Sequence, residues 1–250
     1  MMKSKKINKL FCLVVFGIAV TAGVLATSCG KKDYTHDGPV NQEAVSKIGF
    51  YETYKMREIY DALIELNEKT KESADSLTFA ELTGFMALAE SQKESPVIGS
   101  VKAEDSAAVD TIIARYGPQC LPADLKLAWT AKPEVNDQGE AFSQLIALRM
   151  IQGLPAMTGE SIVEAKSVFD DKTGYSIGLR LNDEGARMFS KITAQNINWA
   201  IAIVVDGKVI SYPIVNCQID GGILQIPGNF TEEEAMNVVD FIYDMDTLKL

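Results

Sequence analysis

Two runs of acidic residues are the first groups in this chain that could do chemistry. Asp170 and Asp171 are adjacent, and three glutamates occupy residues 232–234. Carboxylates grouped in this way suit a hard cation such as Ca²⁺. Asp170 and Asp171 open a turn, however, and residues 232–234 fall in the first turn of a predicted helix, where Thr231 and Glu234 form a capping box. We therefore interpret both runs as structural and expect no metal and no cofactor.

The groups needed for nucleophilic or zinc chemistry are sparse. His36 is the only histidine, and it lies in a polar stretch before the first predicted element. Without a histidine in the folded part, a Ser-His-Asp or Cys-His arrangement is not available. The sequence also contains no G-x-S-x-G motif and no phosphate-binding glycine loop. We interpret Trp129 and Trp199 as core or sheet-face residues, not as a sugar platform, and we do not expect an enzyme.

The first 28 residues differ in composition from the rest. Four lysines lie near the start, an apolar run follows, and "LATSCG" ends this region with Cys29 and Gly30. This order is typical of a secretory signal, and small residues before a cysteine resemble the bacterial lipoprotein box, in which the cysteine is lipidated. Leu25 lies four residues before Cys29, where the commonest form places it three before. We expect residues 1–28 to be a lipoprotein signal peptide, with an ordinary signal peptide as the alternative.

A lipidated Cys29 implies a place in the bacterial cell envelope, facing the periplasm. Gly30 is not the acidic residue that retains some lipoproteins in the inner membrane, so the outer membrane is favoured. No other apolar run approaches the roughly 20 residues of a membrane helix, so the expected membrane contact is the N-terminal lipid anchor only. In an exported protein Cys120 and Cys217 could form a disulfide.

The charge of the chain limits its partners. Removing the signal changes the formal charge from −10 to −14, because 20 of the 24 basic residues are left against 34 acidic ones. So acidic a domain should repel nucleic acid at long range, and we expect no nucleic-acid partner.

Hydrophobic periodicity predicts the elements that position these groups. Residues 29–47 are polar, contain Gly and Pro, and predict a flexible stalk. Residues 140–151 suit a helix or a strand, and their place between strands favours a strand. Interleaved strands and helices favour an α+β fold with antiparallel or mixed sheets. Other strands are predicted at residues 48–54, 95–103, 124–132, 161–170, 175–182 and 221–229, and helices at residues 55–73, 76–91, 104–117, 182–197 and 230–245.

The strongest local signal is the apolar, β-branched run at residues 200–215, which Asp206 and Gly207 divide. Asp-Gly favours positive φ at two turn positions and predicts a two-residue type I′ hairpin. Both arms are apolar on both faces, so we expect a buried or central position. Pro213 cannot donate a backbone hydrogen bond, so the second arm should be interrupted or bulged there.

The same region carries a family resemblance. The segments "AIVVDGKVISYPIV", "IDGG" and "QIPGNFTEEEA", after "TGESIVEAKSVFDDKTG" and "LRLNDEGARMFSKIT", are similar to the first periplasmic domain (P1) of SecD. SecD is the auxiliary subunit of the bacterial Sec protein-export machinery. Weaker similarity upstream extends the resemblance to residues 48–250. The matching motif positions are Asp206, Gly207, Lys208, Ser211, Pro213, Gly221, Gly222, Gly228, Asn229, Phe230 and Thr231.

The resemblance implies a two-lobed domain. A ferredoxin-like base would comprise residues 48–156 and 231–250, and an inserted α/β head would comprise residues 157–230. In SecD the head is thought to contact the emerging polypeptide and to swing relative to the base. The hinge positions that this implies are Gly153, Pro155 and Gly159.

Several features depart from the family pattern. SecD continues into membrane helices, and the residues for its proton-coupled work lie there or in its partner SecF. The sequence here ends at Leu250, so none of those residues is carried over and a proton-driven motor is not implied. Tyr212 stands where the family usually has a small residue, and Asn216 and Cys217 also differ.

The expected function is that of a non-enzymatic envelope lipoprotein. It would bind exported or unfolded polypeptide, or a protein partner in export or envelope assembly, and strand addition to a sheet edge is the expected mode. A scaffold lipoprotein that keeps the fold without binding peptide is the alternative. An envelope hydrolase with paired carboxylates is the least favoured hypothesis.

Overall fold

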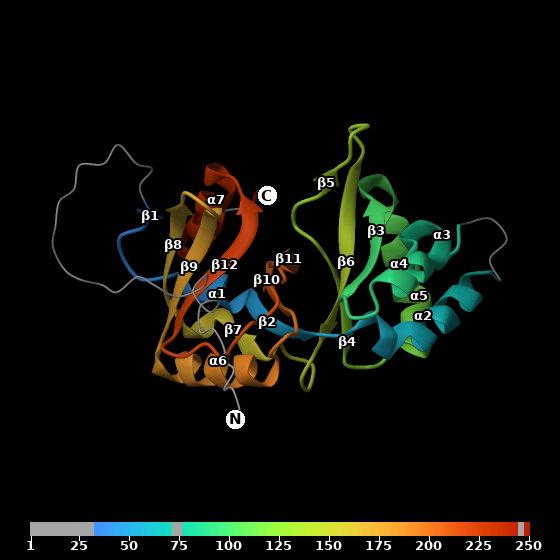
Figure 1. The fold of residues 1–250 in the computed structure, drawn as a ribbon, viewed down its shortest axis with the longest axis horizontal. Coiled ribbons are helices and arrows are strands. Elements are labelled where there is room, and N and C mark those ends of the chain that lie inside the picture. The colour runs from blue at the N-terminus through green and yellow to red at the C-terminus, as the bar shows by residue number, and fades with distance from the viewer. Residues whose placement is uncertain (1–32, 72–76, 245–247) are drawn as a thin grey trace, which may run out of the picture.

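The computed structural model describes residues 33–71, 77–244 and 248–250. The predicted signal peptide and Cys29 lie outside these residues. The described chain forms two lobes that lie side by side and are joined by β2 (Ile48–Thr53) (Figure 1). We call residues 33–51 and 157–250 the terminal lobe, and residues 52–156 the central lobe.

The central lobe packs its helices against an antiparallel sheet. Its apolar core contains the fully buried side chains of Leu63, Phe79 and Phe85. The strands are β3 (Val97–Lys102), β4 (Leu125–Trp129), β5 (Glu134–Val135) and β6 (Ala141–Arg149), and a 3-10 turn spans Ala103–Asp105. The helices are α2 (Met56–Lys71), α3 (Phe79–Thr83), α4 (Phe85–Ser91) and α5 (Ser106–Cys120).

Two helix predictions in this lobe need correction. The single helix predicted at residues 76–91 is two short helices that meet at Gly84. The predicted stop at Gly117 is wrong, because α5 continues to Cys120. Gly117 is buried beside Leu121 and Ile113, so a small residue serves close packing there and does not end the helix.

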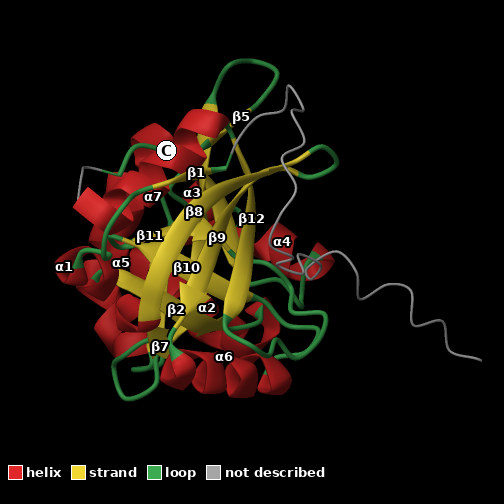
Figure 2. Cartoon of the chain, turned by 90° about the vertical axis from the view of Figure 1, so that its left-hand side faces the viewer, coloured by secondary structure: helices red, strands yellow, loops and turns green. Residues whose placement is uncertain are grey.

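The terminal lobe contains a four-stranded antiparallel sheet in the order β1-β8-β9-β12. Figure 2 shows α6 across the lower end of this sheet. The strands are β1 (Tyr34–Thr35), β7 (Met157–Thr158), β8 (Ile162–Asp170), β9 (Gly174–Leu181), β10 (Ile201–Val205), β11 (Lys208–Ser211) and β12 (Ile223–Phe230). The helices are α1 (Gln42–Ser46), α6 (Asp183–Gln195) and α7 (Glu232–Asp244), and a 3-10 turn spans Gly159–Ser161.

Strand β2 belongs to both lobes. Residues Ile48 to Glu52 of β2 pair with β10. Glu52 and Thr53 pair with β6. The other edge of β6 pairs with β4, and Thr130, directly after β4, forms a parallel bridge to Val209 of β11. Strands β2, β6, β4, β11 and β10 therefore form a closed circuit of hydrogen-bonded neighbours. The apolar cluster inside it comprises Tyr51, Val97, Ala128, Ile146, Leu148, Ala202, Val204 and Val209.

The hairpin prediction is confirmed. Asp206 and Gly207 have φ angles of +46° and +80° and join β10 to β11. Every residue of β10 is buried, and β11 ends at Ser211, before Pro213. Residues 140–151 form a strand, as their position indicated, and all strand pairs between the named strands are antiparallel, which confirms the α+β class.

The predicted flexible stalk at residues 29–47 is wrong for residues 33–47. Strand β1 pairs with β8, and helix α1 buries Ala44 and Val45 in the core. The polar side chains of this segment find partners on α7: the Tyr34 hydroxyl donates to Asp240 at 2.7 Å, and His36 Nε2 lies 2.8 Å from the same carboxylate. This hydrogen bond to Asp240, together with burial, raises the pKa of Tyr34 to about 12.

The sole histidine is consequently part of the folded protein, contrary to expectation. His36 stacks on Tyr243 with a centroid distance of 5.0 Å and also lies 3.6 Å from Asp244. These contacts hold the segment after β1 against α7, which is a structural role.

The last helix also differs from the expected division into base and head. The prediction grouped residues 231–250 with residues 48–156. Instead α7 packs across β8 and β9, because its apolar face, including Val238 and Phe241, belongs to the core of the terminal lobe. The lobe that was expected to be residues 157–230 thus includes α7 and the segment before β2.

Candidate functional site

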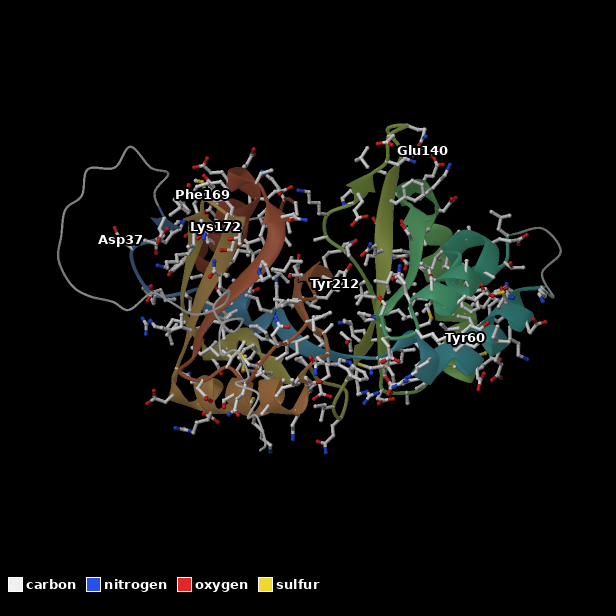
Figure 3. All side chains as sticks on the ribbon, viewed as in Figure 1. Asp37, Tyr60, Glu140, Phe169, Lys172 and Tyr212 are labelled. Carbon is white, nitrogen blue, oxygen red and sulfur yellow. The ribbon has the colours of Figure 1, made fainter. Side chains whose placement is uncertain are left out.

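An open groove lies between the two lobes and is lined by residues of both. Its volume is about 880 Å³. Residues around β5, including Lys132, Glu134 and Gln144, form one wall, while β11 with Tyr212, and the end of β12 with Asn229, form the other. Figure 3 shows Tyr212 between the lobes. The groove is therefore built from segments of both lobes.

A smaller apolar cavity adjoins this groove inside the terminal lobe. Its volume is about 280 Å³, and Pro213 and Pro227 line both hollows. Ile214 lines the cavity while 63 % of it is exposed, which places it at the opening. The other apolar residues of the wall are Phe50, Tyr175, Phe189, Ile201, Ile203, Val215, Ile219, Leu224 and Ile226.

Local sequence explains how this junction forms. The tight turn at Gly207 brings β11 back along β10, and β11 is interrupted at Pro213, which lies where groove and cavity meet. Beyond the interruption Ile214 forms an antiparallel bridge to Ala200, before β10. The Ser211 hydroxyl donates to the Pro227 carbonyl, which ties β11 to β12. Beyond Pro227 the register of β12 shifts, with Asn229 at φ +49°.

Two pairs of side chains bridge the groove. The Tyr212 hydroxyl donates to Gln144 Oε1 at 2.5 Å, and Lys132 Nζ lies 2.8 Å from Glu234 Oε2. Burial and the nearby charge of Glu134 raise the pKa of Tyr212, while the hydrogen bond with Gln144 opposes this. Burial disfavours the charge of Glu234, but hydrogen bonds from Lys132 and Thr231 hold its pKa below the usual value.

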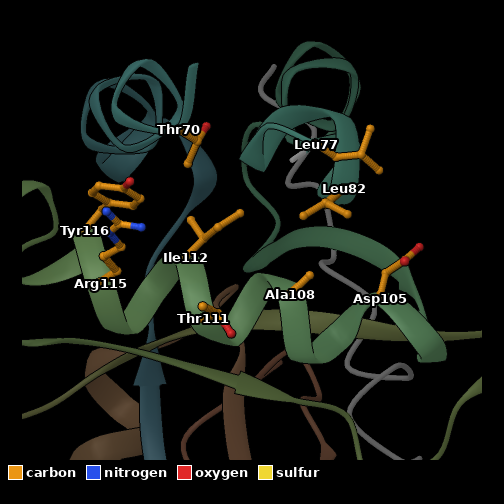
Figure 4. A pocket seen from close by; sticks show the side chains of 9 residues that line it. All are labelled: Thr70, Leu77, Leu82, Asp105, Ala108, Thr111, Ile112, Arg115 and Tyr116. Carbon is orange, nitrogen blue, oxygen red and sulfur yellow. The ribbon is translucent and has the colours of Figure 1, made fainter. Parts of the chain in front are cut away.

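A third hollow crosses α5 in the central lobe (Figure 4). Its volume is about 290 Å³, and Ile112 of α5 lies between Leu82 at one end and Tyr116 at the other, where Tyr116 lies below Thr70 of α2. It shares no lining residue with the groove or the apolar cavity. We therefore treat the groove and its adjoining cavity as the candidate site.

One residue of each acidic run accepts hydrogen bonds from nearby backbone N–H groups. Asp170 accepts hydrogen bonds from the backbone of Lys172 and Thr173, and these bonds lower the pKa of its carboxyl group. Glu234 accepts from the Thr231 N–H at 2.7 Å and Thr231 accepts in return, which confirms the capping box. Among the described residues no group of three or more His, Cys, Asp or Glu side chains could hold a metal ion.

Comparison with known families decides the domain type. A family model described as "SecDF, P1 head subdomain" matches residues 137–242. This chain has a SecD-like P1 domain. The matched range extends beyond the predicted head, residues 157–230, at both ends, and takes in β6 and most of α7.

Curated relatives agree with this domain type. Protein translocase subunit SecD of Rhodothermus marinus is 34% identical over 157 residues, covering 62% of this chain and 25% of that protein. Protein translocase subunit SecDF of Thermus thermophilus is 37% identical over 86 residues, covering 34% of this chain and 12% of that protein. The chain therefore spans a quarter or less of the length of these two relatives.

A solved structure of SecDF, described as a membrane component that enhances protein export, is also similar. Its TM-score is 0.33 at 17% identity, covering 77% of this chain and 90% of that chain. Within the part of the present chain that the structure describes, no helix has the length and apolar character needed to cross a membrane.

Some of the SecD-like motif residues line the candidate site, and the others lie elsewhere. Ser211, Pro213, Gly228 and Asn229 line the groove. Gly222 lies elsewhere, against Ala186 of α6, where a Cβ would meet the alanine side chain. The remaining motif residues position these groups: Asp206, Gly207 and Lys208 form the turn into β11, Gly221 precedes β12, and Phe230 and Thr231 join β12 to α7.

The predicted hinge positions lie in or just after residues 150–156, the second connection between the lobes. Gly153 has φ +83° in an exposed turn that Ile151 and Leu154 close with a bridge. Gly159 is buried, and Pro155 packs near Gly49. A hinge motion at these residues stays a prediction.

The suggested disulfide is contradicted. Cys120 ends α5 in the central lobe, whereas Cys217 lines the cavity of the terminal lobe, and the two are not joined to each other. The tryptophans serve the framework: Trp129 is 9% exposed and donates to Asp110, and Trp199 donates to the Thr53 carbonyl.

Proposed function

We propose that this protein is a non-enzymatic lipoprotein of the bacterial cell envelope whose SecD-like P1 domain binds an extended segment of exported polypeptide. The observation that carries the proposal is the junction between the open groove and the apolar cavity at Pro213 and Pro227. The lining of the groove offers polar side chains from both lobes, including Gln144 and Tyr212. The cavity offers an apolar receptacle of about 280 Å³ beside it.

This pairing of hollows suits an unfolded chain. An extended segment presents its backbone groups along its length and points successive side chains to opposite sides. One apolar side chain can enter the cavity while its neighbours remain in the groove, which is the division of roles found in recognition by strand addition. The only requirement on the sequence of the bound segment is then one apolar residue. Such a low requirement would allow the site to bind many different exported proteins.

Binding should depend on the mouth of the cavity. Ile214→Asp should weaken the binding of an unfolded secretory protein to purified residues 30–250 by about tenfold or more, since the bound polypeptide would cover a charge that has no partner in the apolar cavity. Fluorescence titration measures the dissociation constant. The control is Ile223→Asp, because Ile223 is 56% exposed in the same lobe but does not line the cavity.

The proposal has two separate points of failure. If the unmodified domain shows no saturable binding at tens of micromolar polypeptide, the polypeptide-binding function is wrong. If Ile214→Asp and Ile223→Asp weaken binding equally, the cavity is not the receptor, even if the domain binds. Circular dichroism on both variants establishes that each remains folded.

The lipid anchor is tested independently. Cys29→Ser should move the protein from the membrane fraction to the soluble fraction of cells, because the acyl chains on Cys29 are the proposed membrane contact. Cys120→Ser is the matched control and should leave the distribution unchanged. A Cys29→Ser protein that stays with the membranes would exclude lipidation as the means of attachment. Separating the two membranes tests the preference for the outer one.

A further inference from the structure

The outer edge of β11 is already occupied by another part of the chain. The N–H of Ala131 donates to the Val209 carbonyl at 2.8 Å, and Thr130 forms a parallel bridge with Val209. Thr130 is in turn held to Gln144 by two hydrogen bonds of 2.9 and 3.0 Å. The segment at residues 130–133 thus runs beside β11 in the place where an added strand would lie.

This segment makes only a short ladder with β11. Pro133 has no N–H to donate, so the pairing that starts at Ala131 cannot continue through residue 133. A longer polypeptide strand could pair with more of β11 and so compete for the same carbonyl. An edge strand accepts whichever neighbour offers the better set of backbone hydrogen bonds.

A side-chain contact holds the segment in place. Lys132 Nζ lies 2.8 Å from Glu234 Oε2 and 3.4 Å from the Asn229 carbonyl oxygen. The Glu234 side chain is 16% exposed and is itself fixed by the Thr231 N–H at 2.7 Å. Lys132 therefore ties residues 130–133 of the central lobe to the start of α7 in the terminal lobe.

We propose that residues 130–133 are a built-in competitor for the polypeptide site, held against β11 by the Lys132–Glu234 pair and displaced when an extended polypeptide pairs with Val209. This inference rests on the proposed function and adds a regulatory element to it. The domain exchanges an internal strand neighbour for an external one, so its affinity depends on how firmly Lys132 holds the segment.

Lys132→Met tests whether the Lys132–Glu234 ion pair holds residues 130–133 against β11. The substitution keeps the length of the side chain and removes the charge. For a partly exposed ion pair we expect about a two- to fivefold faster hydrogen exchange of the Ala131 amide without polypeptide, and about two- to fivefold tighter polypeptide binding. Residue-resolved exchange by NMR and the fluorescence titration measure the two effects. Arg180→Met is the matched control, since it removes the Arg180–Glu164 pair at 2.7 Å away from the groove.

The unmodified protein gives the direct test of displacement. Saturating polypeptide should accelerate exchange of the Ala131 amide, because its acceptor on Val209 is taken. If polypeptide binds while this amide keeps its protection, the competition is refuted and the proposed function stands. Unchanged exchange in Lys132→Met would refute the role of Lys132. If neither the unmodified protein nor any variant binds polypeptide, the proposed function fails and the competition fails with it. Binding without loss of protection at Ala131 refutes the competition alone.

Discussion

Replacing Phe50 by alanine is expected to lower the free energy of unfolding by about 3–5 kcal/mol, the usual cost of truncating a fully buried phenylalanine. Phe50 is 1% exposed on β2, and its ring packs edge-on against Phe189 with centroids 5.5 Å apart. It also lines the apolar cavity, so the space left behind would join a hollow that is already present. Urea denaturation followed by circular dichroism gives the value.

Phe50→Leu serves as the control for this prediction. It keeps most of the apolar volume and should cost no more than about 1.5 kcal/mol. If Phe50→Ala costs less than Phe50→Leu, or both cost nothing measurable, the ring does not have the close-packed position that the structure assigns to it. Polypeptide binding by Phe50→Ala then tests whether a larger cavity still accepts an apolar side chain.

The second large effect is expected at Gly159. A Cβ on this residue would lie 2.5 Å from the Val45 carbonyl oxygen and 2.6 Å from the Ile48 Cβ. Both neighbours belong to the packed junction of α1 and β2, so neither can move without disturbing the core. Gly159→Ala should therefore destabilise the domain by about 2–3 kcal/mol, as overpacking typically does. Thermal and urea unfolding measure the change.

Gly153→Ala is the informative comparison. No atom lies within 4 Å of a Cβ at Gly153, but its φ of +83° disfavours an L-residue, so the expected cost is about 1 kcal/mol. A larger cost at Gly159 than at Gly153 would assign Gly159 to packing. Equal costs near 1 kcal/mol would contradict the steric account and leave flexibility as the reason for both glycines.

The elements that follow from neighbouring residues could be predicted from the sequence. Asp206 and Gly207 determine their hairpin locally, and Thr231 and Glu234 determine the start of α7, so the structure agrees at both places. The contacts between the two ends of the described chain could not be predicted in this way. His36 meets Asp240 across 204 positions, and nothing near His36 in the sequence indicates that partner.

Only one wall of the candidate site could be predicted from the sequence, because the other wall depends on contacts between distant residues. One wall is the hairpin and motif region that the sequence singled out, including Ser211 and Pro213. The opposite wall contributes Lys132, whose partner Glu234 lies 102 positions away, and Gln144, whose partner Tyr212 lies 68 positions away. A groove between lobes arises from tertiary placement, and no local periodicity reports it. Tyr212 departs from the family pattern, but this departure alone predicts no groove.

The shared strand β2 sets the geometry of any relative movement of the lobes. Within the described residues the chain passes between the lobes twice, once along β2 near Tyr51 and once through residues 150–156. Two bodies joined at two points can turn freely only about the line through those points. The glycine-containing crossing can absorb such a rotation, whereas β2 is paired with β10 and β6 and must absorb it as strand twist. The pairing of Thr130 and Ala131 with Val209 holds the lobes together at a further place, so any such rotation would first require these backbone contacts to open.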